Sequence, residues 1–314
     1  MDAAVNFPTT PKAVKTVSLK LHKRMSVEQA FEAIASNCLE QVRGNVDGVA
    51  RFHDRESLHQ LRVGVRRLRA ALALFDELIH PPDDLTSECA WLMEQLGAAR
   101  DWDVLVASTL PQAQAALEGL GQAAVLAGLA EAAQRRLDAA YEQAGAALNS
   151  LRFQKLMSKL DHWIAQRAWR TDLSGKGKTR LKMRAIDCAA ALLEREQQRL
   201  LQRGRKLKGA SQEQRHRVRI AAKRTRYAAQ FFASLFPGRQ VRPYVAAVSA
   251  LQQELGTLND GAVARGLLGQ LAAANPALGE GVALVVGFIA GSAHCAEPRV
   301  RRLWRKLAPL DPPS

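Results

Sequence analysis

The sequence predicts an all-α protein made of two homologous helical halves. Ala, Leu, Gln, Glu and Arg, which are strong helix formers, dominate the 314 residues. Apolar residues recur at spacings of three and four, and no segment shows the sustained alternation of a β-strand. One pattern of residues occurs twice, half a chain apart, which indicates an internal duplication. We therefore expect two four-helix-bundle halves related by a pseudo-twofold axis.

The duplicated pattern begins with a histidine and continues with arginines. The first copy runs His59-Gln-Leu-Arg62-Val-Gly-Val-Arg66-Arg67-Leu-Arg69, and the second runs His216-Arg-Val-Arg219-Ile-Ala-Ala-Lys223-Arg224-Thr-Arg226. A second match follows each copy, because Leu96-Gly97 with Arg100-Asp101 corresponds to Leu255-Gly256 with Asn259-Asp260. A weaker match, Ala33-Ile34 and Ala185-Ile186, precedes them. Three matches in the same order at nearly one offset favour a true repeat.

Pro and Gly residues suggest the boundaries of the predicted domain. We expect a loose tail at 1–19, a helical domain at 20–308 and a short tail at 309–314. Within the domain, half one covers 20–172, a linker covers 173–178 and half two covers 179–308. Further turns or breaks are expected where proline and glycine cluster, at Pro81-Pro82, Pro111, Pro237-Gly238, Asn275-Pro276 and Pro298.

Three features of the sequence favour an intracellular protein. The N-terminus lacks the apolar core of a signal peptide. The longest apolar run, Val282–Ala290, is too short to span a bilayer and is interpreted as part of a core helix. Four scattered cysteines form no CxxC pair, so they predict buried, reduced thiols. We expect a soluble cytoplasmic protein with no transmembrane segment.

The positive charge lies almost entirely in the second half. Residues 1–157 carry 17 Lys and Arg against 19 Asp and Glu, whereas residues 158–314 carry 28 against 11, and the chain has a net charge of +15. Such an excess favours a polyanionic partner. With only 5% aromatic residues, the chain is a poor candidate for a protein that stacks many bases.

On a helix, the repeated motif forms a one-sided cationic stripe. At about 100° per residue, the basic side chains of the first copy lie within about 80° of His59, at Arg55, Arg62, Arg66 and Arg69. The second copy gives the same stripe at His216, Arg219, Lys223 and Arg226, next to an apolar face that must pack into the bundle. Arg67 and Arg224 both fall off the stripe.

These cations repel one another and no carboxylate lies within either stripe, so stability alone would not select the arrangement twice. The stripe from His59 to Arg69 rises about 15 Å, which suits an extended row of phosphates better than one small anion. The alternative is that each stripe is a solvated basic face, and that the histidines are structural. The duplicated register favours a binding role.

The motif resembles the CHAD family, the conserved histidine α-helical domain. The resemblance covers about residues 20–308 and includes the segment from Leu96-Gly97 to Arg100-Asp101 and Asp103. It implies two four-helix halves with a basic groove or pore between them. It also implies binding of inorganic polyphosphate and association with polyphosphate granules. Carried over residue by residue, the implied binding residues are His59, Arg62, Arg66, Arg67, Arg69, His216, Arg219, Lys223, Arg224 and Arg226.

The second copy departs from the family pattern at Lys223 and at Asn259, and remains basic on the same face. No ExExK motif of the CYTH triphosphatase domain, which is often fused to this family, occurs in the sequence. The chain also lacks GxSxG, P-loop and GxGxxG motifs. We expect no catalytic residues, no metal site and no cofactor. Asp101 and Asp260 are expected to pair with motif arginines or to cap helices.

The sequence contains three other basic clusters. One surrounds the linker, one precedes the second motif at Arg203, Arg205, Lys206 and Lys208, and one lies near the C-terminus, around Arg299–Lys306. Each is interpreted as a solvated surface when taken alone. Together they permit weak, non-specific binding of nucleic acid, which is the alternative function. A kinase or phosphatase acting on polyphosphate is the third hypothesis.

Overall fold

The structure is a computed structural model that describes residues 11–119, 121–171 and 173–314. These residues are almost entirely helical and contain no strand, only an isolated bridge between Ser26 and Arg184. The all-α prediction is therefore confirmed. The helices of the first half are α1 (Val27–Arg43), α2 (Val46–Ala50), α3 (Arg55–Leu74), α4 (Asp76–Ile79), α5 (Asp83–Gln95), α6 (Gly97–Val104), α7 (Leu110–Ala116), α8 (Ala123–Leu148) and α9 (Leu151–Ala165).

The second half has fewer and longer helices. After α10 (Gly175–Leu181), they are α11 (Ala185–Gly204), α12 (Gln212–Phe231), α13 (Gly238–Ala274) and α14 (Gly279–Leu307). Short 3₁₀ or π segments connect several of the helices, at Leu105–Thr109, Ala168–Arg170, Ala233–Leu235 and Pro276–Leu278.

Polar side chains fix the N-termini of the helices that matter most for the site. Asp54 accepts a hydrogen bond from the Ser57 N–H at the start of α3. Ser211 and Gln214 form a reciprocal capping box at the start of α12. Both duplicated motifs therefore begin within the first turns of a capped helix, and every stripe residue lies on a regular helix.

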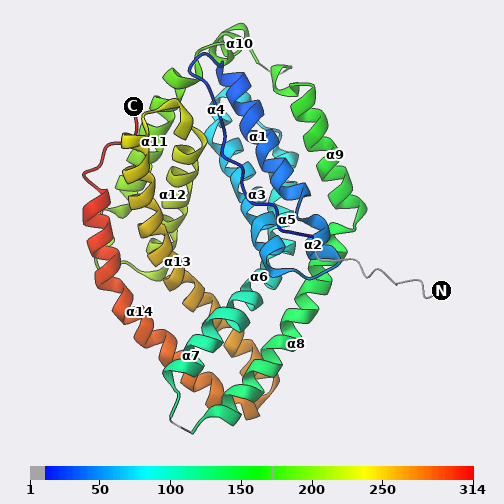
Figure 1. The fold of residues 1–314 in the computed structure, drawn as a ribbon, viewed down its shortest axis with the longest axis vertical. Helices are drawn as coiled ribbons and strands as arrows, with labels where there is room; N and C mark the ends of the chain where they lie inside the picture. The colour runs from blue at the N-terminus through cyan, green and yellow to red at the C-terminus, as the bar shows by residue number, and fades with distance from the viewer. Residues whose placement is uncertain (1–10, 120, 172) are drawn as a thin grey trace, which may run out of the picture.

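The two halves touch at both ends and leave a space between them (Figure 1). Within the halves, α1 packs on α3, and α11 packs on α12, which packs on α13. At one end the Val27 N–H donates to the Met183 carbonyl at 2.9 Å, and the rings of Phe75 and Phe232 lie 5.9 Å apart. At the other end α7 and α8 pack on α14, and α6 packs on α13. The pseudo-twofold relation between the halves stays a prediction.

The glycine in the first motif permits close packing between helices. A Cβ atom on Gly64 would lie 2.9 Å from Val42 Cγ2 and 3.1 Å from the Val42 backbone nitrogen. Only a residue without a side chain lets α3 approach α1 this closely. The contact fixes the rotation of α3, so its basic stripe faces away from α1.

Proline and glycine end fewer helices than predicted. The prediction of a turn at Pro298 is wrong, because this proline lies inside α14. Pro111 lies in the first turn of α7, directly after the π segment Leu105–Thr109 that interrupts the α-helix, and the chain stays helical on both sides of it. The predicted linker is partly helical, because Ser174 caps α10 by accepting a hydrogen bond from the Gly177 N–H.

The predicted N-terminal tail is partly held in place. Residues 1–10 lie outside the described residues. In the described part, the Val14 N–H donates to Asn45 Oδ1 at 3.0 Å, and the Thr16 hydroxyl donates to Gln41 at 2.9 Å. Residues 11–19 form no helix and are attached to α1 and to Asn45, which precedes α2.

One helix of the described residues is long and apolar enough to cross a membrane, over Pro276–Leu307, with a mean hydropathy of 1.5 in its most apolar window. Only 17% of that window is buried. The apolar run Val282–Ala290 does lie on α14, where Val285 and Ile289 are buried, but most of the helix lies near the surface. The absence of a transmembrane segment stays a prediction.

Candidate functional site

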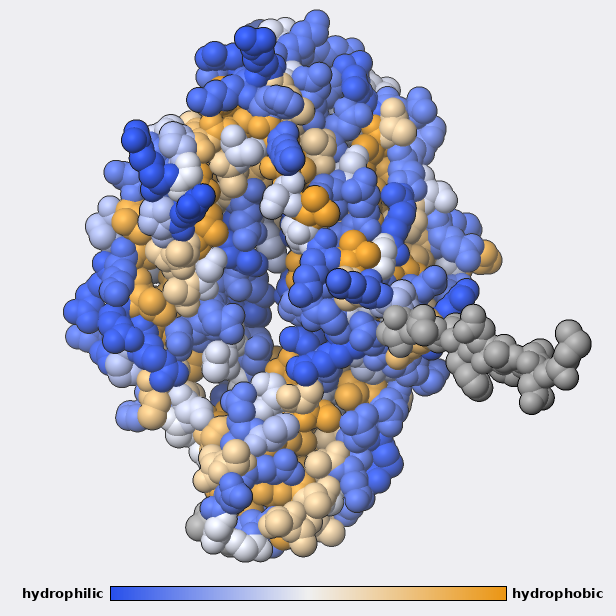
Figure 2. All heavy atoms as spheres, viewed as in Figure 1, coloured by the Kyte–Doolittle hydropathy of each residue, from blue (hydrophilic) through white to orange (hydrophobic). Residues whose placement is uncertain are grey.

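Both cationic stripes face one cavity of about 830 Å³ between the halves. Figure 2 shows the molecule hollowed there, with hydrophilic residues on both sides. The walls come from α3, α6, α12 and α13. Eight Arg and Lys side chains line this central cavity against two carboxylates, Asp101 and Asp260. Nine of the ten predicted site residues are among its lining residues: His59, Arg62, Arg66, Arg69, His216, Arg219, Lys223, Arg224 and Arg226.

Burial makes these cations unusually costly. Burial and the neighbouring charge of Arg66 together lower the pKa of Arg62 to about 10, although Asp101 acts in the opposite direction. Burial likewise lowers the pKa of Arg219 and of Arg226. Lys223 responds most strongly, since burial and the charges of Arg219 and Arg66 lower its pKa to about 7. These four charges in the central cavity are therefore held at a cost to the folded protein.

Buried hydrogen-bond donors in the central cavity have no partner. The Nε atoms of Arg66, Arg219 and Arg226 are buried and make no hydrogen bond to any described residue. The hydroxyl of Tyr227 and the Oε1 atom of Gln252 are in the same condition. Buried polar groups are nearly always paired in folded proteins, so several guanidinium donors without acceptors in one cavity indicate an anion site.

The two carboxylates of the central cavity do not neutralise the stripes. No ion pair within 4.0 Å joins Asp101 or Asp260 to a motif residue among the described residues. Burial raises the pKa of Asp101, and Arg62 acts in the opposite direction. The predicted pairing of these two aspartates with the motif arginines is thus not seen. The carboxylate that does pair is Asp103, whose side chain is 3% exposed and binds Arg55 at 2.9 Å and also Arg100.

The two histidines sit at equivalent places with different neighbours. The pKa of His59 is lowered, first by burial and then by the charges of Arg100 and Arg66. In the second half Asn259 stands where Arg100 stands in the first, and its Oδ1 atom lies 3.0 Å from His216 Nδ1. The departure of Asn259 from the family pattern thus replaces a repelling cation with a hydrogen-bond partner.

Arg67 is the one predicted binding residue that the structure places elsewhere. It is 3% exposed and donates to Gln41 at 3.0 Å and to Thr16 at 3.2 Å. Its guanidinium lies 5.5 Å from the ring centre of Phe231, on the other half. It therefore ties α3 to α1, the N-terminal segment and α12. Arg67 and Arg224 have equivalent positions on the helical wheel of their motif copies. In the structure, Arg224 lines the central cavity and Arg67 does not.

Besides Asp101, Asn259 and Asp260, four polar residues outside the predicted site line the central cavity: Arg100, Tyr227, Gln252 and Gln253. Arg100 belongs to the second repeated segment, outside the histidine–arginine motif from which the site was predicted. Tyr227 directly follows the motif residue Arg226, whose guanidinium lies 4.7 Å from the tyrosine ring centre. Gln252 and Gln253 come from α13, and no charge signal in the sequence could have singled them out.

Comparisons with known proteins agree with this architecture. The model of the CHAD domain family matches residues 33–269. The crystal structure of the CHAD domain from the plant Ricinus communis is similar, with a TM-score of 0.85, 35% identity, and coverage of 96% of this chain and 98% of that one. PptA from Streptomyces chartreusis has a related fold, with a TM-score of 0.66, 17% identity, and coverage of 90% of this chain and all of that one.

No curated protein sequence matches the chain. The family match nevertheless spans most of the sequence and includes both copies of the histidine–arginine motif. The PptA comparison supports the fold alone, because the identity is low. With a family model covering 33–269 and a solved relative at 35% identity, the chain belongs to the CHAD domain family.

Proposed function

We propose that this protein binds inorganic polyphosphate in the central cavity. The observation that carries the proposal is the pair of opposed cationic stripes on α3 and α12, with three arginines whose buried Nε donors have no acceptor among the described residues. Phosphate oxygens accept strong charge-assisted hydrogen bonds from arginine. A polyanion in the cavity would satisfy these donors and relieve the repulsion between the stripes.

The dimensions favour an extended phosphate chain over a single small anion. Each stripe rises about 15 Å along its helix, and a single phosphate would reach only a part of it. The cavity of about 830 Å³ also has room for several phosphate groups. The CHAD family resemblance implies the same ligand. Affinity would come from counterion release and arginine contacts, so it should fall steeply with salt.

Nucleic acid is the competing ligand. The net charge of +15 permits non-specific binding, but a duplex is too wide to enter a cavity enclosed by four helices. The central cavity offers little surface for stacking bases, since Tyr227 is the only Phe, Tyr or Trp residue among its described lining residues. We expect long-chain polyphosphate to displace duplex DNA at equal phosphate concentration, and the reverse result would favour the alternative.

The direct test is a titration with long-chain polyphosphate, in which isothermal titration calorimetry measures the affinity. The central variant reverses four lining charges, with Arg62, Arg66, Arg219 and Lys223 each changed to Glu. We expect it to lose binding. The matched control reverses four exposed cations outside the central cavity, at Arg135, Arg136, Lys155 and Arg265. The control keeps most of the affinity, whereas unchanged binding by a folded central variant would reject the site.

The proposed role is binding without catalysis, in the cytoplasm and on polyphosphate granules. Incubation of the protein with polyphosphate and a divalent metal should release no orthophosphate. The fluorescently labelled wild-type protein should accumulate on granules. The central variant, with four lining cations changed to Glu, should be distributed evenly through the cytoplasm.

A further inference from the structure

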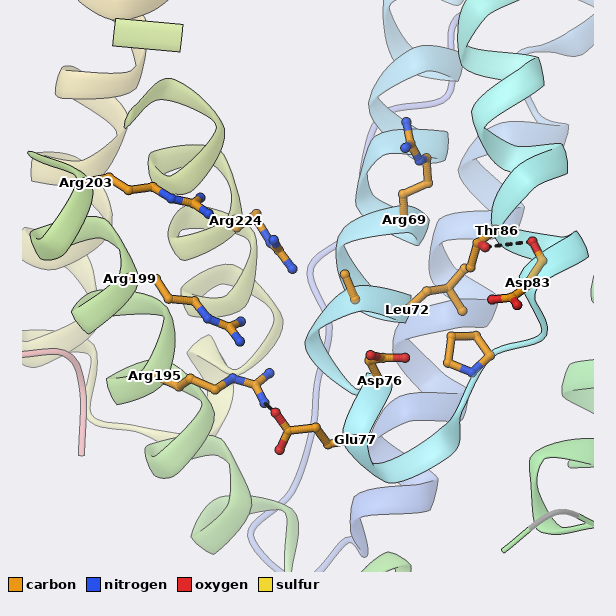
Figure 3. A pocket seen from close by; sticks show the side chains of 12 residues that line it. Arg69, Leu72, Asp76, Glu77, Asp83, Thr86, Arg195, Arg199, Arg203 and Arg224 are labelled. Atoms are coloured by element: carbon orange, nitrogen blue, oxygen red, sulfur yellow. Dashed lines mark hydrogen bonds and ion pairs between the residues drawn. The ribbon is translucent and has the colours of Figure 1, made fainter. Parts of the chain in front are cut away.

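A second cavity of about 510 Å³ adjoins the central one (Figure 3). One wall is α11 together with Arg224 of α12, and the opposite wall is the C-terminal part of α3 with α4 and the start of α5. Arg69, Ala73 and Arg224 line both cavities. The second cavity therefore begins where the stripe of α3 ends.

Three arginines on α11 extend the cationic surface into this second cavity. Arg195, Arg199 and Arg203 follow one another at intervals of four residues, so they share one face of the helix and span about 12 Å. Figure 3 shows their side chains pointing across the cavity toward α3 and α4. This row lies outside both copies of the repeated motif.

One buried carboxylate, Glu196, lies against two arginines of the row, Arg195 and Arg199. Glu196 is 2% exposed, and its oxygens lie 2.6 Å from Arg199, 3.7 Å from Arg224 and 3.8 Å from Arg195. A single negative charge cannot neutralise three guanidinium groups. Arg203 is exposed and makes no ion pair with any described residue. Positive charge therefore remains around Arg199, Arg203 and the shared Arg224.

The end of the second cavity farthest from the central cavity is acidic. The Arg195 guanidinium is already paired there, since it donates hydrogen bonds to Glu77 at 2.9 Å and to the Leu74 carbonyl at 2.7 Å. Asp76 and Asp83 line the same end. A polyanion would be attracted as far as Arg199 and Arg203 and repelled beyond them.

We infer that a polyphosphate chain bound in the central cavity continues past Arg69 and Arg224 onto Arg199 and Arg203, and stops before the acidic end formed by α4 and α5. This inference rests on the proposed function. The α11 row then acts only on chains long enough to leave the central cavity. The row makes the affinity for polyphosphate increase with chain length even for chains that already fill the central cavity. The central stripes alone would give no such increase.

The test compares tripolyphosphate with long-chain polyphosphate on two variants, R203E and R199Q/R203Q. Long chains should bind about tenfold more weakly to the double variant, while tripolyphosphate binds within about twofold of the wild type. Loss of two phosphate contacts should also lower the salt dependence of long-chain affinity by roughly 1.4 in the log–log slope. R203E changes an exposed side chain, so its effect is independent of any rearrangement around Glu196.

The matched controls are R136E and R135Q/R136Q, which make the same charge changes on the exposed face of α8. Long-chain affinity equal to that of these controls would overturn the inference and leave the central site standing. Equal losses for tripolyphosphate and long chains would also overturn it, because the row would then act on the central cavity alone. If the wild-type protein binds neither ligand, the proposed function itself fails.

Discussion

At the scale of single residues, Lys223 is the most informative position in the central cavity. Its charge is opposed by Arg219 and Arg226 on its own helix and by Arg66 on α3, and only Asp260 on α13 supports it. Burial and these charges bring its pKa from 10.5 down to about 7. An arginine at the same place would stay charged at any working pH. The departure from the first motif copy therefore gives the second copy a titrating group.

This pKa predicts a pH dependence of binding. Phosphate beside Lys223 raises its pKa toward the ordinary value, so binding takes up a proton wherever the free protein has the lysine neutral. Affinity for long-chain polyphosphate should be highest below about pH 7 and fall above it, by at most about tenfold per pH unit. Calorimetry in buffers of different ionisation enthalpy measures the proton uptake directly.

The control for the pH effect is K223R, which should bind more tightly above pH 7 and show a flat profile there. Long chains are used because few of their phosphates are titrating end groups. A wild-type profile that is also flat between about pH 6 and about pH 9 would show that Lys223 does not contact the ligand. His59 is not expected to carry this effect, since its pKa is already lowered below its usual value.

The fate of the two off-stripe arginines shows what a helical wheel can and cannot decide. Arg67 and Arg224 occupy the same wheel position, but the first has Gln41, Thr16 and Phe231 around it and the second has Glu196. Whether such a side chain is buried depends on which helix covers it. That information is absent from the motif.

At the scale of helices, the packing of α3 against α1 sets the direction of the first cationic stripe. Gly64 makes this close approach possible, and the motif alone gives no reason for a glycine at that position. The spacing of the charges was predictable from the sequence because it depends only on helical geometry. The breaks were harder to predict. Pro298 and Pro111 both lie within helices, so a proline by itself does not mark where these helices end.

Replacing Gly64 with Val should destabilise the protein by about 1–3 kcal/mol, because the new side chain would overlap Val42 and push α3 away from α1. Thermal unfolding measures this change. G269A is the control, since it also places a Cβ on a helical glycine but meets no atom within 4 Å, and it should be neutral or stabilising by up to about 1 kcal/mol. A G64V variant as stable as the wild type would mean that the two helices are less tightly packed than described.

At the scale of the whole molecule, contacts at the two ends hold the halves with their charged faces opposed. The end contacts, such as Phe75 with Phe232, are apolar or backbone-mediated and outweigh the repulsion across the central cavity. The scaffold therefore stores an unfavourable electrostatic energy that a polyanion can release. Stability and binding should consequently respond to the same substitution in opposite directions.

Below about pH 7, replacing Arg66 and Lys223 with Met should raise the melting temperature of the ligand-free protein by about 2 °C or more, because two partly buried, mutually repelling charges are removed. The same variant should lose most of the stabilisation that polyphosphate gives the wild type. Thermal unfolding with and without ligand tests both effects. An R66M/K223M variant that melts below the wild type in the ligand-free state would contradict the stored-repulsion account.

The sequence by itself determined the helical class, the duplication and nine of the residues that line the central cavity, because helical periodicity and repeated motifs are local properties of the chain. Only the tertiary structure decided that the two stripes face each other, that Arg67 is buried and that α11 adds a second row of arginines. Those outcomes depend on contacts between residues far apart in the chain. Such contacts follow from how whole helices pack, and no local pattern encodes them.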